Sequence, residues 1–538
     1  MDNLNLKWVS DTIGEEYKQW RKGDIITIQA QTGTGKTYFV KNKLVSSMDL
    51  HEHMLILANR INLKRQLKKD LLKNMKKDMP LSNEELDKMY EFGNVTIMSY
   101  QQINQIKHRE TYDDKKLNLD FYDYIICDEC HFIMSDGGFN NKCDYSILSL
   151  IKNNIRAIKV FISATMEEVK NIIVGSLNNK AFGILPKHYD YTTGIDYSYI
   201  DAKYFKNIKD MAVIIKNSPK ENGKWLIFVT KKIDGITIKE IIGNLKTVSI
   251  ITKETKNNED LNNILENSKF NSDVLICTKA LDNGVNISDC EVKNIVIMSF
   301  DKITFLQELG RIRQDINNTY KVNLYIQTKS KKSFTTLISK IYEPKFKLIN
   351  EYCGANDDGL LPKKYTDEEK EKIYKEFCIK YNRDFDKLPK DIFYIDKLGK
   401  WKINIIGYAR LIKDNKFANH MVDLFKKDYK FAFIKEQLSW INLENTFNEN
   451  NLMENVMDNE DLNNIEIYLQ SLVGVRLHKE ARNELIDKLN LTDSRGRQQK
   501  KITTLAGYVL DNFNMILISK KVKEKGKLVT IWLLNNVE

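Results

Sequence analysis

Short apolar runs rich in β-branched residues alternate with helical stretches from Asp24 to Ile326. The first series comprises Asp24 to Ala30, Met54 to Ala58, Asn94 to Met98, Tyr122 to Cys127 and Lys159 to Ser163. The second series comprises Lys224 to Val229, Val248 to Ile251, Asp273 to Cys277, Asn294 to Ser299 and Val322 to Ile326. Buried strands that alternate with helices are typical of parallel sheets. The pattern therefore predicts an α/β fold with two parallel-sheet domains in tandem.

Breaks in this alternation predict the domain boundaries. The polar stretch from Asn178 to Gly194 lacks helical periodicity, and we expect it to link the two sheets. Beyond Lys340 the segments are helical and rich in Lys, Tyr and Phe, and an Asn- and Glu-rich patch from Glu444 to Asn464 is expected to be a hinge. We therefore expect four units, at residues 1–190, 191–340, 341–455 and 456–538.

The last unit is expected to contain helices and a hairpin. Its predicted elements are helices at Ile465 to Val473, His478 to Leu489 and Ile502 to Leu510, and strands at Met515 to Ser519 and Leu528 to Leu533. Three helices before a lysine-rich hairpin resemble a winged helix. Four cations precede the third helix, where they are expected to contact nucleic-acid phosphates: Arg495, Arg497, Lys500 and Lys501. The alternative is a packing domain with a solvated lysine face.

Composition narrows the class of protein. The 538 residues are 42% hydrophobic and 29% charged with 6 prolines, which is globular composition. A net charge of +11 fits either a polyanionic partner or simple solubility. Seven cysteines form no regular framework and no signal segment opens the chain, so we expect a reducing cytoplasm. No apolar run approaches the ~20 residues that span a bilayer, so we expect no membrane segment.

A glycine-rich loop follows the first predicted strand. It reads Ala30-Gln31-Thr32-Gly33-Thr34-Gly35-Lys36-Thr37 and leads into a predicted helix, which is the context of a Walker A phosphate loop. Backbone N–H groups from Thr32 to Thr37 are expected to surround ATP phosphates. Lys36 is expected to reach the β and γ phosphates, and the Thr37 hydroxyl to bind Mg²⁺.

An acidic pair ends a later strand. Asp128 and Glu129 directly follow the apolar run that ends at Cys127. A carboxylate at this edge of a parallel sheet can reach a metal ion at the phosphate loop, so Asp128 is the expected Mg²⁺ partner. Glu129 is the expected general base for the attacking water. Cys127, Cys130 and His131 also spell a haem-attachment pattern, which we reject because it ends a buried strand. A zinc site is rejected as well, because Cys143 lacks a paired partner.

Together, Ala-x-Thr-Gly-x-Gly-Lys-Thr and Asp-Glu-Cys-His resemble superfamily 2 helicases of the DExH group, including phage or plasmid types. The resemblance implies two RecA-like domains that bind ATP between them. It implies that His131, Ser163 and Thr165 couple ATP state to domain closure. It also implies strand-contacting residues in Leu55 to Gln66, where Asn59 and Arg60 are our candidates, and a second such segment at Val95 to Gln102.

The second sheet carries two further family-like segments. Thr278-x-x-x-Asp282-x-Gly284 resembles a segment that touches nucleic acid through Thr278, couples through Asp282 and contacts nucleotide near Gly284. Gln307-Glu308-Leu309-Gly310-Arg311-Ile312-Arg313 resembles the arginine-finger motif, which implies catalytic roles for Gln307, Arg311 and Arg313. Arg311 fits directly, whereas Arg313 arrives one residue early, so its role as second finger stays open. No glutamine motif of the DEAD-box kind precedes the phosphate loop, so adenine selectivity stays open too.

These features predict an ATP-dependent helicase or translocase with ATP and Mg²⁺ as cofactors. We expect single-stranded or forked DNA as its partner, in replication, recombination or repair, with RNA as the other option. Two alternatives remain: an ATP-gated clamp or remodeller that does not unwind, and a winged-helix regulatory protein with a vestigial ATPase. Polarity, protein partners and oligomeric state are not predicted by the sequence.

Overall fold

The computed structural model describes most of the chain. The described residues are 4–58, 61–74, 81–109, 118–135, 156–174, 186–252, 254–255, 258–278, 286–353, 366–381, 388–395, 400–454, 459–491, 497–524 and 527–537. Within these ranges, every helix is too short or too polar to cross a bilayer.

The first sheet has seven strands and is parallel except for one edge pair. Its order is β3 (Glu91–Phe92), β4 (Val95–Met98), β2 (Met54–Leu57), β5 (Tyr124–Asp128), β6 (Ile158–Ser163), β1 (Ile25–Gln29) and β7 (His188–Thr192). Neighbouring side chains of a strand enter different clusters: Ile126 packs in one and Ile125 in the other. Because successive side chains point to opposite faces, helices on both faces bury this sheet.

The helices of this domain follow its strands in sequence. They are α1 (Val9–Ile13), α2 (Lys36–Phe39), α3 (Val45–Ser47), α4 (Ile61–Asn74), α5 (Asn83–Lys88), α6 (Tyr100–Arg109), α7 (Phe132–Ser135) and α9 (Glu167–Val174). A π-helical turn at Val40–Leu44 joins α2 to α3.

The predicted linker at 178–194 is wrong in its second half. Strand β7 lies there and pairs with β1 in parallel, Ile25 opposite His188 and Gln29 opposite Thr192. Its residues alternate between buried and exposed, as expected of an edge strand, so the stretch shows no apolar run. Trp20 covers the aromatic side, with its ring 6.3 Å from that of Tyr191. Part of the predicted linker, residues 178–185, lies outside the described residues.

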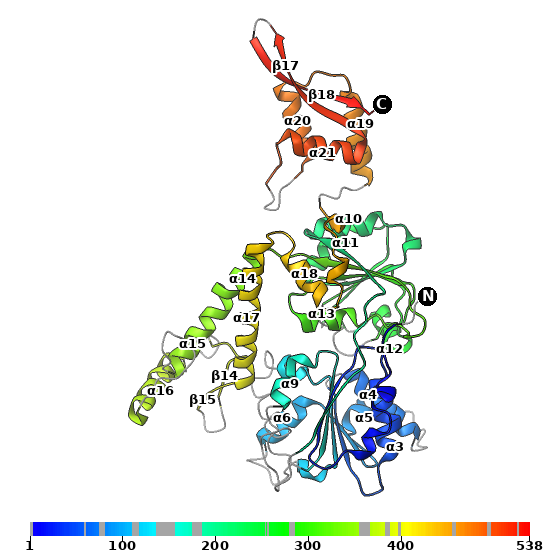
Figure 1. Ribbon diagram of the computed structural model, residues 1–538, viewed down its shortest axis with the longest axis vertical. Coiled ribbons are helices and arrows are strands. Elements are labelled where there is room, and N and C mark those ends of the chain that lie inside the picture. The colour runs from blue at the N-terminus through cyan, green and yellow to red at the C-terminus, as the bar shows by residue number, and fades with distance from the viewer. Residues whose placement is uncertain are drawn as a thin grey trace.

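The second sheet also has seven strands, all parallel. Its order is β10 (Val248–Ile251), β11 (Val274–Cys277), β9 (Lys224–Phe228), β12 (Val292–Ile297), β13 (Val322–Gln327), β8 (Ile200–Phe205) and β16 (Leu452–Met453). Its helices are α10 (Ile208–Asn217), α11 (Lys232–Ile242), α12 (Glu259–Asn267) and α13 (Lys302–Leu309). Two tandem parallel-sheet domains, as the sequence predicted, are therefore confirmed (Figure 1).

The prediction of a hinge from Glu444 to Asn464 is wrong for the described residues of this patch, which form two short helical turns, strand β16 and the start of the helix that begins at Asn459. Leu452 and Met453 pair with β8, and the Asn451 side chain donates a hydrogen bond to the Ala202 carbonyl at 2.9 Å. The chain thus returns to the second sheet after the helical region and completes its edge. Residues 455–458, which follow, lie outside the described residues.

A helical arm stands beside the two sheet domains (Figure 1). It comprises α14 (Lys331–Leu337), α15 (Glu343–Cys353), α16 (Asp367–Tyr381), the hairpin β14–β15 (Phe393–Ile395 and Trp401–Ile403), α17 (Ile405–Lys427) and α18 (Ala432–Ser439). A second π-helical turn, Ile338–Tyr342, joins α14 to α15. Trp401 and Trp440 are buried in this region. Both pack against other aromatic rings, Trp401 against Phe377 and Trp440 against Phe305.

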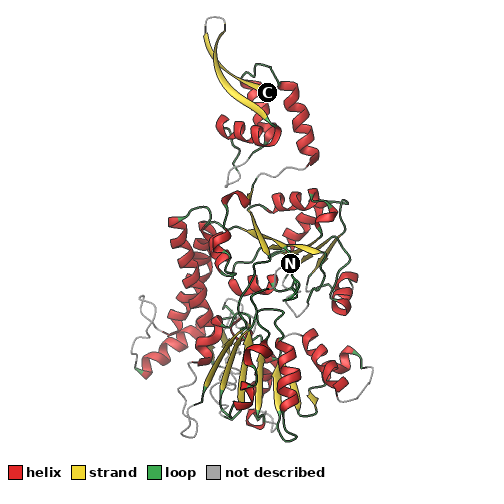
Figure 2. Cartoon of the chain, turned by 45° about the vertical axis from the view of Figure 1, so that its right-hand side comes forward, coloured by secondary structure: helices red, strands yellow, loops and turns green. Residues whose placement is uncertain are grey.

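The C-terminal unit has its own apolar core. It contains α19 (Asn459–Leu472), α20 (Lys479–Leu489), α21 (Ile502–Phe513) and the antiparallel hairpin of β17 (Met515–Glu524) and β18 (Lys527–Asn536). Leu505 and Val509 of α21 pack against Trp532 and Leu534 of the hairpin within one cluster. The hairpin is longer than the pattern predicted, and its far end extends beyond the three helices (Figure 2).

Candidate functional site

The loop between β1 and α2 has the backbone that a phosphate cradle needs. Gly33 and Gly35 have φ of 95° and 82°, which favours glycine because a Cβ is strained there. The Trp8 ring packs on this loop, since a Cβ at Gly35 would lie 3.1 Å from it. The Val9 N–H also donates to the Thr34 carbonyl at 2.9 Å. The segment before α1 therefore supports the loop from outside.

The acidic pair lies across from this loop. Lys36 Nζ is 2.9 Å from Glu129 Oε1, and both side chains are largely buried. Glu129 has φ of 48°, a left-handed conformation that is uncommon for a residue with a side chain and recurs at functional sites. The Tyr100 hydroxyl donates to the Asp128 carbonyl at 3.0 Å and so fixes the end of β5. The two residues expected to serve catalysis, Lys36 and Glu129, are thus brought into direct contact.

A hydrogen-bonded chain crosses from the first domain to the second. Gln307 on α13 bonds to His131 Nε2, whose ring is almost fully buried. The amide of Gln307 is the donor there, so the ring proton lies on Nδ1, which is 2.8 Å from Ser163 Oγ. Ser163 Oγ in turn lies 3.2 Å from Thr165 Oγ1. The residues expected to couple ATP state to closure, apart from Asp282, therefore form one connected chain with Gln307.

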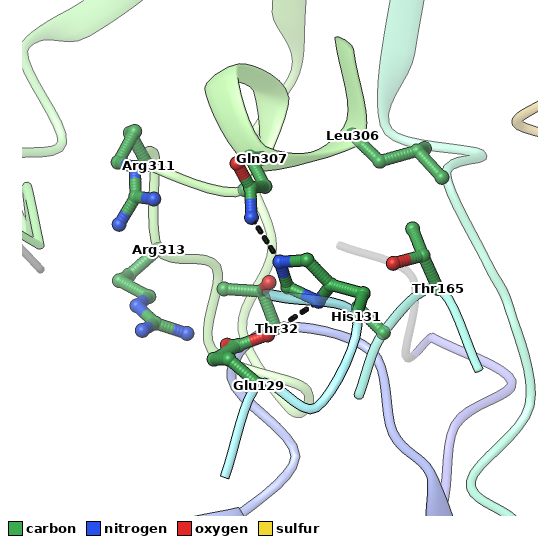
Figure 3. Close-up of a pocket in the computed structure, with 10 residues that line it drawn as sticks. Thr32, Glu129, His131, Thr165, Leu306, Gln307, Arg311 and Arg313 are labelled. Atoms are coloured by element: carbon green, nitrogen blue, oxygen red, sulfur yellow. Dashed lines mark hydrogen bonds and ion pairs between the residues drawn. The ribbon is translucent and has the colours of Figure 1, made fainter. Parts of the chain in front are cut away.

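A pocket lies where these segments meet. It is lined by Thr32, Glu129, His131, Ala164, Thr165, Leu306, Gln307, Gly310, Arg311 and Arg313. Figure 3 shows the two arginines on the same side of the pocket, with Arg313 nearer to Glu129. Both arginines from the second domain thus face a cavity whose floor comes from the first.

The second domain approaches the phosphate loop closely at Gly310. A Cβ at this position would lie 2.6 Å from Thr32 Oγ1, so only glycine fits the observed distance. Arg311 is buried, and Arg313 Nη2 donates to Asn286 Oδ1 at 2.5 Å. Although Arg313 comes one residue earlier in the sequence than the family motif has it, its side chain lines the pocket.

The cysteines of the decoy pattern are buried beside the acidic pair. Burial raises the pKa of the Cys127 thiol to about 12 and that of Cys130 above its ordinary value. Both thiols are therefore protonated at neutral pH and are poor ligands and nucleophiles.

Some expected residues are outside the part of the chain that the structure describes, and others do not line the pocket. Asn59, Arg60, Asp282, Gly284 and Arg495 fall outside the described residues. Thr278 follows β11, and its N–H donates to the Ile251 carbonyl at 3.3 Å.

The remaining expected cations, Arg497, Lys500 and Lys501, precede α21 in the C-terminal unit, whose core is separate from the pocket. Sequence reasoning missed Trp8 and the tight fit at Gly310, because both depend on contacts between distant segments.

Two family models match the chain. The model described as "Type III restriction enzyme, res subunit" matches residues 7–168, and the one described as "Helicase conserved C-terminal domain" matches residues 205–314. The first match contains the phosphate loop and the acidic pair, and the second contains Gln307 and both arginines. No curated protein matches the chain.

The similarities of the chain to solved structures are weak. Saccharomyces cerevisiae Dbp5 bound to RNA and ADP BeF3 is 19% identical, with 66% of this chain and 89% of that chain covered and a TM-score of 0.41. A DEAD box protein from Methanococcus jannaschii is 17% identical over 61% and 87%, with a TM-score of 0.35. The DUF1998 helicase MrfA bound to DNA is 13% identical over 74% and 60%, with a TM-score of 0.43.

The assignment rests on the two family-model matches and on their order along the chain. The N-terminal match covers most of the first parallel-sheet domain, and the helicase C-terminal match covers much of the second. The chain therefore belongs to the superfamily 2 helicases, with two RecA-like domains and the ATP hydrolase activity of that class.

Proposed function

We propose that this helicase binds ATP in the pocket between its two sheets and uses hydrolysis to move along, or separate, strands of DNA. One observation carries the proposal: Thr32, Glu129, Arg311 and Arg313 line a single pocket although they come from two domains. Groups that stabilise a phosphoryl-transfer transition state must surround the γ-phosphate together. Only the closed arrangement of the two domains brings these groups together around the γ-phosphate.

The Lys36–Glu129 ion pair gives the first step of the mechanism. An arriving γ-phosphate competes for the Lys36 ammonium, because a phosphate carries more negative charge than a carboxylate. Glu129 is then released to orient a water molecule for attack and to accept its proton. The carboxylate thus becomes available only when the substrate is in place.

The residues present also fit a magnesium ion. The Thr37 hydroxyl follows Lys36 at the start of α2, and the Asp128 carboxylate ends β5. Oxygen donors of this kind suit Mg²⁺, which takes its remaining ligands from phosphates and water. When bound, the ion neutralises charge on the phosphate oxygens. Thr37 and Asp128 are the residues that would hold it.

Arg311 and Arg313 supply positive charge from the second domain. Charge that develops on the γ-phosphate is stabilised when these groups stand over it, so hydrolysis follows closure. The His131–Gln307 bond holds the two domains at this distance. Loss of the γ-phosphate weakens the attraction and lets the domains part, which changes the grip on the bound strand.

We assign strand contacts to two regions. Thr278, which follows β11, is one candidate in the sheet domains, and Asn59 and Arg60, which lie outside the described residues, stay candidates from the sequence resemblance. The C-terminal unit, which we interpret as winged-helix-like, adds the cations before α21 and a hairpin whose Lys520, Lys521 and Lys523 are exposed. Contacts of lysine and arginine with phosphates bind nucleic acid with little sequence preference and strong salt dependence. We favour DNA because winged helices more often bind duplex DNA.

The test is steady-state ATPase activity of the wild type and Glu129→Gln, without polymer and with single-stranded DNA, duplex DNA or RNA. We expect stimulation by DNA in the wild type and loss of turnover in the variant. Equal activity with every polymer, or with none, would contradict a DNA motor. Unwinding of a forked duplex then separates a helicase from an ATP-gated clamp.

A further inference from the structure

Helix α17 is anchored in both RecA-like domains. Near its N-terminal end, Ile406 belongs to the apolar cluster of the first domain, and Ala409 packs against the same cluster. Farther along, Ala418, Met421 and Phe425 belong to the main cluster of the second domain. Figure 1 shows the helix running alongside both domains. A continuous helix of 23 residues is about 34 Å long, so it reaches from one anchor to the other.

Ion pairs reinforce this bridge at the seam between the domains. Lys413, on α17 between the two anchors, lies against Glu168 on α9 of the first domain, and burial there holds the pKa of the lysine below its usual value. Lys302, at the start of α13 in the second domain, pairs with the neighbouring Glu167 at 3.1 Å. The Gln29 amide also donates to Glu167 at 3.3 Å. Two adjacent carboxylates thus hold one lysine from the arm and one from the second domain.

Both carboxylates are placed to influence the nucleotide pocket. Glu167 and Glu168 lie two and three residues after Thr165, on the segment that begins with Ser163. Lys302 opens the helix that carries Gln307. Burial alone would raise the pKa of Glu167, but the hydrogen bond and charge of Lys302 outweigh it and hold the pKa below its usual value. The carboxylate is therefore charged at neutral pH and available for pairing.

Apolar packing also joins the helical arm to elements of both domains. Helix α7 follows His131, and its Ile133 and Met134 share a cluster with Ile406 of α17. Phe305 and Leu309 of α13 share the other cluster with Met421. The arm therefore contacts the helix after the acidic motif and the helix before Arg311.

We propose that α17 is a brace for the closed ATPase, and that Lys413 is a positioning residue that holds Glu168, and with it the Ser-Ala-Thr segment, against the second domain. The inference rests on the proposed function. Lys413 does not touch the pocket and acts through the relative placement of the two domains. Breaking its pair favours the open state, in which Arg311 and Arg313 are withdrawn from the phosphates.

The experiment compares Lys413→Glu, Glu168→Lys and the double swap in the full chain, at saturating DNA. Charge reversal replaces an attraction by a repulsion, and we expect kcat/KM for ATP to fall about fivefold in each single variant. The swap restores the opposite charges and is expected to recover activity to within about twofold. Lys416→Glu is the matched control, since Lys416 is exposed on the same helix, and it is expected to match the wild type.

Fluorescent ADP binding separates positioning from damage. Its phosphates bind the loop of the first domain, so stoichiometry and affinity are expected to stay unchanged in all four variants. A lower stoichiometry in the single variants, parallel to their loss of turnover, would mean simple misfolding and would overturn the inference. The inference would also be overturned if the single variants had wild-type kcat/KM, or if the double swap had a kcat/KM no higher than either single variant.

Glu129→Gln is included to separate this inference from the proposed function. If that variant retains turnover, the proposed mechanism fails. If it loses turnover while Lys413→Glu does not, only the brace fails.

Discussion

Replacing Gly310 by alanine tests whether hydrolysis needs the observed approach of the two domains. A Cβ at this position lies 2.6 Å from Thr32 Oγ1 and 3.1 Å from Thr32 Cβ. Ordinary van der Waals contact begins at about 3.4 Å, so the second domain must withdraw by roughly 0.8 Å. The φ of Gly310 is −70°, which alanine adopts without backbone strain, and the added Cβ would also lie 3.1 Å from the Leu306 carbonyl oxygen of the same domain, so the stability of the variant has to be measured as well.

The size of the effect follows from what that displacement breaks. The His131–Gln307 bond stretches, which costs about 0.5–1.5 kcal/mol, and the arginines are displaced with the same segment. Misplacement of catalytic groups by about 1 Å can cost on the order of 100-fold in rate. We expect kcat for DNA-stimulated ATP hydrolysis to fall by roughly 30- to 100-fold.

The assay is steady-state turnover at saturating ATP and DNA, with thermal unfolding measured in parallel. Gly507→Ala is the matched control, because the same methyl group meets no atom within 4 Å there and full activity is expected. Thr32→Ala removes the closest atom, so the Thr32→Ala/Gly310→Ala double variant is expected to recover part of the loss. Full activity of Gly310→Ala would refute the need for this closed arrangement.

Three further predictions concern coupling, stability and binding. A double-mutant cycle of His131→Ala and Gln307→Ala in kcat is expected to show a coupling of about 1 kcal/mol, and additive losses would deny the link. Burial lowers the pKa of Lys159 from 10.5 to about 8. Below pH 8 the lysine is protonated in both the native and the unfolded state, and its burial lowers the free energy of unfolding by about 3 kcal/mol. This loss of stability disappears as the pH rises to 10.5. Lys159→Met is therefore expected to raise Tm at pH 7 and less so at pH 10, and an equal gain at both would contradict this sign. Lys500→Ala/Lys501→Ala is expected to reduce the slope of log K for DNA against log salt by about 2, whereas an unchanged slope would exclude both from phosphate contact.

The phosphate loop and the acidic pair were predictable because their chemistry is local. A few adjacent residues, such as Gly33, Gly35 and Lys36, have to create the loop and its charge, so the pattern survives in the sequence. The principal buried strands were predictable for a similar reason, since a strand covered on both faces is a continuous apolar run.

Edge strands and long-range contacts were not predictable in this way. Strand β7 alternates polar and aromatic residues, and β16 has only two residues in a polar patch. Their pairing partners lie far away in the sequence. The same holds for the contact of Gly310 with Thr32 and for α17, whose two ends enter different cores although its sequence looks like one ordinary helix.

The segment before α1 has a practical consequence for anyone who attaches something to this protein. The Leu4 N–H donates to the Ile316 carbonyl of the second domain at 3.1 Å, and the Lys7 N–H donates to Thr193 of the first at 2.9 Å. A bulky group attached near Leu4 would therefore lie at the contact between the two sheet domains. A label attached to the C-terminal unit would instead be carried by a unit with its own apolar core. It would not intrude on the contact between the two sheet domains. An N-terminal fusion is thus expected to disturb the contact between the two domains, which makes it more useful for holding them apart than for purification.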